Sequence, residues 1–119
     1  MPRSPLPAGT ESQCDALIRQ LGGAVVQFGK KGRRTRNTFG IPDRLYFVKG
    51  RMWYFECKSK NDYLSAEQIL FLTNVLTHDG LAGCGNRDDL CALLNCPTPT
   101  MRWRLTQDQV LKYSTRKGR

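Results

Sequence analysis

Two apolar runs of the sequence predict a β-hairpin that sets two carboxylates opposite one another. The runs, 44–48 and 51–58, are rich in aromatic and branched residues, and Lys49-Gly50 between them suits a two-residue turn. A turn of that length fixes the register of the two strands, because each residue then has one opposite partner. Continued past the start of the first strand, this register places Asp43 directly across from Glu56.

The opposed carboxylates indicate a site for a cation. Side chains directly opposite one another on a sheet have Cβ atoms about 4.5–5.5 Å apart, and like charges there destabilise the pairing. Lys58 lies two residues beyond Glu56, so we expect it on the same face. We therefore expect Asp43 and Glu56 to hold one metal ion with an amine beside it. The simpler alternative is an ion pair between Asp43 and Lys58 on a solvated face, which leaves Glu56 unexplained.

The charge balance favours a polyanionic partner. The 119 residues include 19 Lys and Arg against 10 Asp and Glu, a formal net charge of +9, and such an excess indicates nucleic acid. No apolar run approaches the roughly 18–20 residues that span a membrane. Five cations in a glycine-punctuated loop before Asp43 are predicted to contact phosphates, the alternative being an ordinary solvated loop: Lys30, Lys31, Arg33, Arg34 and Arg36.

The cysteines predict free thiols in a reducing compartment. Their number is odd and no CxxC pair exists, while His78 is the one histidine. We expect an intracellular protein, in the cytoplasm of a bacterial or phage-infected cell. A zinc site built from Cys84, Cys91 and Cys96 is the weaker alternative, because the spacing matches no usual zinc motif and no fourth ligand follows.

The remaining patterns predict an α/β domain. Because both faces of the hairpin are apolar, it is expected in the middle of a sheet that helices cover on both sides. Residues 1–9 are interpreted as a flexible lead, and 10–119 as a single domain with a basic C-terminal tail. Helices are expected at 10–21, 65–79 and 87–95, with Thr10 and Ser65 as N-caps, strands at 24–28, 81–85 and 101–105, and a last helix from Thr106.

The order of these elements and motifs resembles the PD-(D/E)xK nuclease superfamily and, within it, the VRR-NUC (virus-type replication-repair nuclease) family. The resemblance covers about residues 10–95. One departure is Cys57, where the family often has an aliphatic residue, but a thiol also packs as a small hydrophobe. The motifs that carry the resemblance are Glu11 in the first helix, Gly40-Ile41-Pro42-Asp43-Arg44, Glu56-Cys57-Lys58, Ser65-x-x-Gln68 and Gly80-Leu81-Ala82.

The resemblance implies a restriction-endonuclease-like α/β fold, with a mixed central sheet flanked by helices, and a Mg²⁺- or Mn²⁺-dependent deoxyribonuclease. Phosphodiester hydrolysis needs a nucleophilic water and neutralisation of charge on the phosphate, and a hard divalent ion held by carboxylates supplies both. Asp43 and Glu56 are the predicted ligands, with the backbone carbonyl of Cys57 as a third. Lys58 is predicted to orient or help deprotonate the water, or to stabilise the charge that develops.

Two further site residues come from the resemblance, and each also has a structural explanation. Glu11 is implied as another acid at the metal, directly or through water, but an acid in the first turn of a helix is favoured by the helix dipole anyway. Gln68 is implied to position Lys58 or the water, but Ser65-x-x-Gln68 is equally a capping box.

For the whole chain, the resemblance implies an endonuclease of DNA repair that selects branched DNA, a Holliday junction or a flap, and that acts as a homodimer. The alternative is a basic nucleic-acid-binding module without catalysis. Metal dependence separates the two, because a binding module needs no Mg²⁺ and leaves DNA intact.

Overall fold

The computed structural model describes residues 9–28 and 40–114. The basic cluster between Lys30 and Arg36 and the C-terminal tail beyond Ser114 lie outside the described residues, so the contacts predicted for them stay predictions. The division into a lead, residues 1–9, and one domain, 10–119, also remains a prediction.

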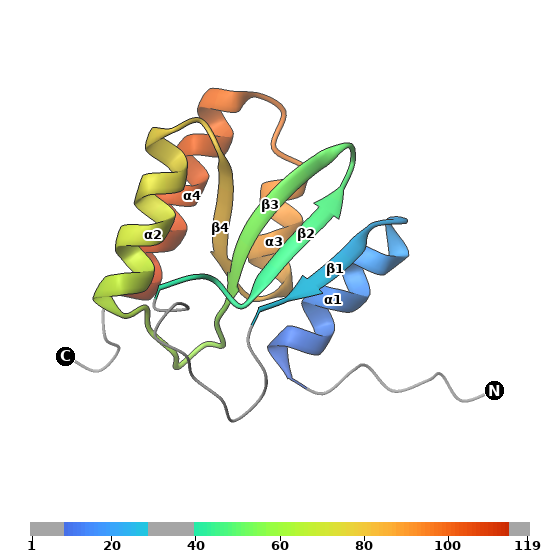
Figure 1. The fold of residues 1–119 in the computed structure, drawn as a ribbon, viewed down its shortest axis with the longest axis horizontal. Helices are drawn as coiled ribbons and strands as arrows, with labels where there is room; N and C mark the ends of the chain where they lie inside the picture. Colours follow the sequence, from blue (N-terminus) through green and yellow to red (C-terminus); the bar gives the residue numbers. More distant parts are fainter. Residues whose placement is uncertain (1–8, 29–39, 115–119) are drawn as a thin grey trace.

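A mixed four-stranded sheet forms the centre of the protein (Figure 1). Its strands are β1 (Ala24–Gln27), β2 (Arg44–Val48), β3 (Arg51–Cys57) and β4 (Leu81–Gly85), and they lie in the order β1-β2-β3-β4. The first three strands are antiparallel, and β4 is parallel to β3. The α/β class with a mixed, helix-flanked sheet is therefore confirmed.

The predicted hairpin and its register are confirmed. Val48 pairs with Arg51 and Arg44 pairs with Phe55, so the two-residue turn is Lys49-Gly50. Both turn residues have positive φ, 55° for Lys49 and 74° for Gly50, as a type I′ turn requires.

Helices cover the sheet on both sides, as Figure 1 shows. The elements α1 (Thr10–Gln20) and α3 (Arg87–Leu94) pack on one face, whereas α2 (Ala66–Thr77) packs on the other. The long helix α4 (Pro99–Ser114) lies along the edge strand β4, where the Thr106 hydroxyl donates to the carbonyl of Ala82 at 2.7 Å.

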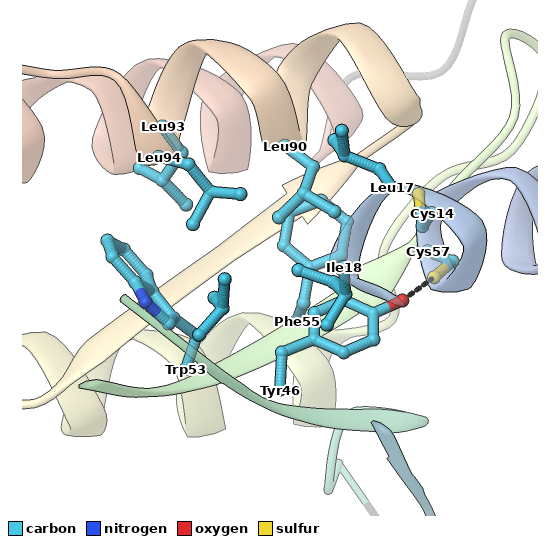
Figure 2. Close-up of a cluster of buried hydrophobic side chains, with 11 residues drawn as sticks. Cys14, Leu17, Ile18, Tyr46, Trp53, Phe55, Cys57, Leu90, Leu93 and Leu94 are labelled. Carbon is cyan, nitrogen blue, oxygen red and sulfur yellow. Dashed lines mark hydrogen bonds between the residues drawn. The ribbon is translucent and has the colours of Figure 1, made fainter. Parts of the chain in front are cut away.

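The core between the sheet and helices α1 and α3 is built from alternate residues of the hairpin (Figure 2). These residues point away from the face of Asp43 and Glu56, as the period of a strand requires. The buried members of this cluster are Cys14, Leu17, Ile18, Tyr46, Val48, Trp53, Phe55, Cys57, Leu90, Leu93 and Leu94. The opposite face is covered only in part, since Phe47 and Met52 are exposed there.

Two local predictions were wrong. Residues 101–105 belong to the helix α4 and not to a strand, because this helix begins at Pro99, directly after Thr98. The Thr98 hydroxyl accepts from the Met101 N–H at 3.1 Å, and proline is favoured in the first turn of a helix. Thr10 does not cap α1: the N-cap is Gly9, and the Thr10 hydroxyl instead donates to Ser59 Oγ at 3.2 Å.

The five cysteines are free, and Cys14, Cys57 and Cys84 are buried as small apolar residues. Within the described ranges, none of the helices combines the length and the apolar character needed to cross a membrane.

Candidate active site

The segment before Asp43 and β2 passes close to the start of α2. Gly40 has φ +78°, and a Cβ there would lie 2.5 Å from the carbonyl oxygen of Glu67. Only glycine allows so close an approach of this backbone to the helix at that φ. Pro42, two residues later, is fully buried. Asp43 follows it and lies at the end of the sheet where β3 also ends.

Asp43 and Glu56 each hold the backbone of the opposite strand. The Asp43 N–H donates to Glu56 Oε1 at 3.2 Å, and the Cys57 N–H donates to Asp43 Oδ1 at 3.2 Å. Two reciprocal bonds therefore fix the carboxylates next to one another, as the register predicts. Glu56 is 5% exposed, so its charge lies almost entirely out of water.

Lys58 and Gln68 converge on the same oxygen of Glu56. Lys58 Nζ lies 3.7 Å from Glu56 Oε2, and Gln68 Nε2 donates to that oxygen at 3.1 Å. The backbone of Lys58 is anchored to β4, because its N–H donates to the Gly85 carbonyl at 2.8 Å. The lysine thus pairs with Glu56, not with Asp43 as in the simple ion-pair alternative.

Gln68 forms the predicted capping box, and its amide contacts Glu56, whereas its predicted role in positioning Lys58 or the water stays a prediction. Its Oε1 accepts from the Ser65 N–H at 2.9 Å, while its own N–H donates to Ser65 Oγ at 3.1 Å, which is a complete capping box. The amide nitrogen of the same side chain remains directed at Glu56. The cap therefore holds the Gln68 side chain in place for its contact with the acidic pair.

Burial and neighbouring negative charges raise the pKa values of both carboxyls. For Asp43 the largest cause is removal from water, followed by the negative charge of Glu56. For Glu56 burial again dominates, and the nearby ammonium of Lys58 partly opposes it by lowering the pKa. A bound cation would relieve both effects, because it favours the charged form of each carboxyl.

Glu11 lies at the same place, although it belongs to the first turn of α1 and is exposed. It is near enough to the Asp43 carboxyl to hydrogen-bond it and to raise its pKa, and its charge also raises the pKa of Glu56. Three acidic side chains from α1, the approach to β2, and β3 thus share one end of the sheet. The role of the Cys57 backbone carbonyl as a metal ligand stays a prediction.

The donor set fits a hard divalent cation of the magnesium type. Among residues 9–28 and 40–114, no group of three or more His, Cys, Asp or Glu side chains is placed to hold a metal ion. Mg²⁺ does not need such a group, because it keeps several waters and binds through one or two carboxylates plus substrate phosphates. The adjacent carboxyl oxygens of half-buried Asp43 and buried Glu56 match that requirement.

Two hollows of the described surface lie away from these carboxylates. One, of about 190 Å³, is lined by residues that include Trp53, Gly80 and Arg102, at the opposite ends of β3 and β4. The other, of about 370 Å³, is lined by residues around the hairpin turn, including Phe47 and Met52.

Sequence reasoning missed a buried polar network directly behind Asp43. Asp15 of α1, which is 5% exposed, accepts from Arg44 Nε at 2.9 Å and from the Tyr46 hydroxyl at 2.7 Å. The network could have been suspected from Asp15, because this acid lies on the apolar face of α1 next to Cys14 and Leu17. A single sequence gives no indication of which distant cation would pair with it.

The fold and the arrangement at the end of the hairpin define the class: an α/β domain of the restriction-endonuclease-like kind, with its acidic cluster where β2 begins and β3 ends. The fold is that of a VRR_NUC domain. A solved structure described as "VRR_NUC domain" is similar to this chain with a TM-score of 0.59 and 18% sequence identity, and the match covers 75% of this chain and 94% of that one. No protein-family model matches the sequence. No curated protein matches it either.

Proposed function

We propose that this protein is a nuclease that hydrolyses phosphodiester bonds of DNA with Mg²⁺ or Mn²⁺. The observation that carries the proposal is the pair of half-buried Asp43 and buried Glu56, held next to one another with Lys58 and Gln68 on one oxygen of Glu56. Like charges are placed together in a folded protein at a cost. A site that binds a cation explains why this chain keeps them there.

Each residue has a distinct task in the proposed reaction. Asp43 and Glu56 hold the ion, which when bound supplies an acidified water and neutralises charge on the phosphate. Lys58 cannot bind a cation, so its ammonium stabilises the charge that builds on the phosphoryl oxygens or orients the attacking water. Gln68 keeps Glu56 in position, because its amide donates to the carboxylate while its carbonyl is fixed by the helix cap.

The preference for branched DNA and a homodimeric state are proposed on the family resemblance. A two-fold dimer would present two active sites to a symmetric junction. Light scattering of the purified protein measures the assembly, and cleavage of single-stranded, duplex, flap and four-way DNA measures the preference.

Five loop cations between Lys30 and Arg36 supply the proposed contacts with the DNA phosphates.

The deciding experiment is cleavage of labelled DNA by the pure protein in Mg²⁺, Mn²⁺ or EDTA. We expect products only with a divalent ion, and none from the Asp43→Asn variant, which keeps the size of the side chain and loses its charge. DNA that is bound tightly but left intact under all conditions would contradict the proposal and favour the non-catalytic binding module. The basic net charge of +9 alone would then explain the affinity.

A further inference from the structure

A buried polar network lies directly behind the candidate active site and joins three residues of two elements. The guanidinium of Arg44 grips both oxygens of Asp15, with Nε at 2.9 Å from Oδ1 and Nη2 at 3.1 Å from Oδ2. The Tyr46 hydroxyl donates to the same carboxylate at 2.7 Å. The side chains of Arg44 and Asp15 are only 9% and 7% exposed, so this contact is sealed from solvent.

The same arginine also holds the backbone of Asp43. Its Nη1 donates to the Asp43 carbonyl at 3.1 Å, and the Phe28 N–H donates to that carbonyl at 3.1 Å as well. The Asp43 carboxylate is meanwhile fixed by the Cys57 N–H. Arg44 is therefore bonded on one side to α1 and on the other side to the peptide of a candidate metal ligand.

Asp15 lies one helical turn beyond Glu11 on α1. Residues four apart project from the same face of a helix, so the contact that holds Asp15 against β2 also determines where Glu11 points. Glu11 reaches the Asp43 carboxyl from that position, although it is itself exposed. The placement of Glu11 thus depends on how α1 is seated on the start of β2.

The stability of the fold does not require an ion pair at this place. Two charges lose their hydration when they are buried, and well-packed apolar residues often do as well or better for stability. A bidentate arginine–carboxylate pair offers instead a fixed relative geometry of the two elements that it joins. Here those elements carry Glu11 and Asp43.

We propose that Asp15, Arg44 and Tyr46 are positioning residues that seat α1 so that Glu11 is presented to Asp43 and Glu56. This inference rests on the proposed function and adds to it the means by which the exposed acid is brought to the metal. Each of the three residues acts through the position of α1 and hence of Glu11.

The test compares Arg44→Lys and Tyr46→Phe with Thr106→Val as the control. Lysine keeps the charge of Arg44 but cannot span both Asp15 oxygens and the Asp43 carbonyl. Thr106→Val deletes a buried hydroxyl bond of similar kind, to Ala82, in a helix that carries none of the candidate site residues. The measurements are Mn²⁺ affinity by calorimetry, thermal stability, and amide exchange along α1 without metal.

We expect Arg44→Lys to weaken Mn²⁺ binding by about 10-fold or more, the range seen for groups that orient metal ligands, and to accelerate exchange in α1. Tyr46→Phe should do the same to a smaller extent, and it carries the test if Arg44→Lys does not fold. Thr106→Val should lower the melting temperature while leaving Mn²⁺ affinity unchanged. Equal Mn²⁺ affinity in Arg44→Lys and the unaltered protein would overturn the inference.

A double-mutant cycle with Glu11→Gln isolates the proposed route. If Arg44 acts through Glu11, Arg44→Lys should weaken Mn²⁺ binding much less in the Glu11→Gln background than in the unaltered one. Additive effects of the two substitutions would overturn the inference while leaving the metal site intact. Absence of Mn²⁺ binding by the unaltered protein would be a different result, since it contradicts the proposed function itself.

Discussion

Replacing Asp43 with Asn should stabilise the metal-free protein at pH 8 while it removes the response to metal. Burial, with the charge of Glu56 next in size, raises the pKa of Asp43 from 3.8 to about 8. The folded protein therefore binds a proton at Asp43 over a pH range in which the unfolded chain does not. By linkage, the free energy of unfolding falls as pH rises from about 4 to about 8.

The magnitude follows from the pKa difference between the two states. Each pKa unit corresponds to about 1.4 kcal/mol, and relaxation and water entry at a half-buried site reduce the full effect. We take one to two units as the effective difference, which gives about 1.4–2.8 kcal/mol. At roughly 4 °C per kcal/mol for a chain of this size, Asp43→Asn should melt about 6–11 °C higher in EDTA at pH 8.

Thermal unfolding between pH 5 and pH 8, with EDTA or with Mg²⁺, measures this effect. The gain from Asp43→Asn should shrink towards pH 5, where the carboxyl of the unaltered protein is protonated. Mg²⁺ should raise the melting temperature of the unaltered protein, by the equivalent of about 2.7 kcal/mol at 100 times its Kd, and should leave Asp43→Asn unchanged. Asp62→Asn is the control of opposite sign, because the Ser59 N–H holds the pKa of exposed Asp62 below its ordinary value.

A lower melting temperature for Asp43→Asn than for the unaltered protein at pH 8 in EDTA would refute this reasoning. That result would mean that the carboxylate is well paired in the folded protein and that no cation is needed to relieve it. The site would then be a structural cluster, and the metal assignment would lose its physical basis.

Four further predictions concern the other site residues and their supports. Glu56→Gln should abolish Mg²⁺-dependent cleavage and leave the circular dichroism spectrum and most DNA binding intact, and near-normal turnover would exclude Glu56 as a ligand. Lys58→Ala should lower kcat far more than Mn²⁺ affinity, since an ammonium does not bind cations, and a loss of Mn²⁺ affinity in calorimetry would make Lys58 structural. Gly40→Ala should cost about 1 kcal/mol or more in urea unfolding, and more than Gly50→Ala, because a Cβ at Gly40 meets the Glu67 carbonyl whereas one at Gly50 meets nothing within 4 Å. Neutralising Arg33, Arg34 and Arg36 together should flatten the dependence of log K on log salt by about two to three units for duplex DNA in Ca²⁺, and an unchanged slope would show that the loop does not contact phosphates.

The hairpin could be predicted from the sequence because its determinants are local. A two-residue turn with glycine at its second position fixes the pairing, and period-2 alternation then fixes which residues share a face. Asp43 and Glu56 were placed together by this argument alone, and their reciprocal backbone bonds are a finer detail of the same register. The close approach of Gly40 to α2 could not be predicted, because it depends on a helix that starts 26 positions later.

The start of α4 shows where local pattern fails. Met101, Trp103 and Leu105 alternate with two arginines, which is the pattern of a half-exposed strand. The helix forms because its polar side chains hydrogen-bond to the backbone of β4. Thr106 donates to the Ala82 carbonyl, and Gln109 Oε1 accepts from the Cys84 N–H at 3.2 Å. These hydrogen bonds join residues that are far apart in the sequence. They therefore override the local alternation and cannot be recognised from the hydrophobic pattern.

The two acidic clusters of this region differ in how far the protein compensates their negative charge. This difference distinguishes a structural role from a catalytic one. Asp15 has a full set of partners, with a bidentate arginine and a phenol, and its charge is compensated within the protein. Glu56 has one lysine beside it, Lys58, which does not pair with Asp43, and Glu11 adds a third negative charge. In a sequence whose local preferences otherwise agree with its fold, a conflict of this kind is expected at a functional site. The negative charge that the described residues leave uncompensated at the end of the hairpin is thus the physical reason to place the cation, and hence the reaction, there and not at Asp15.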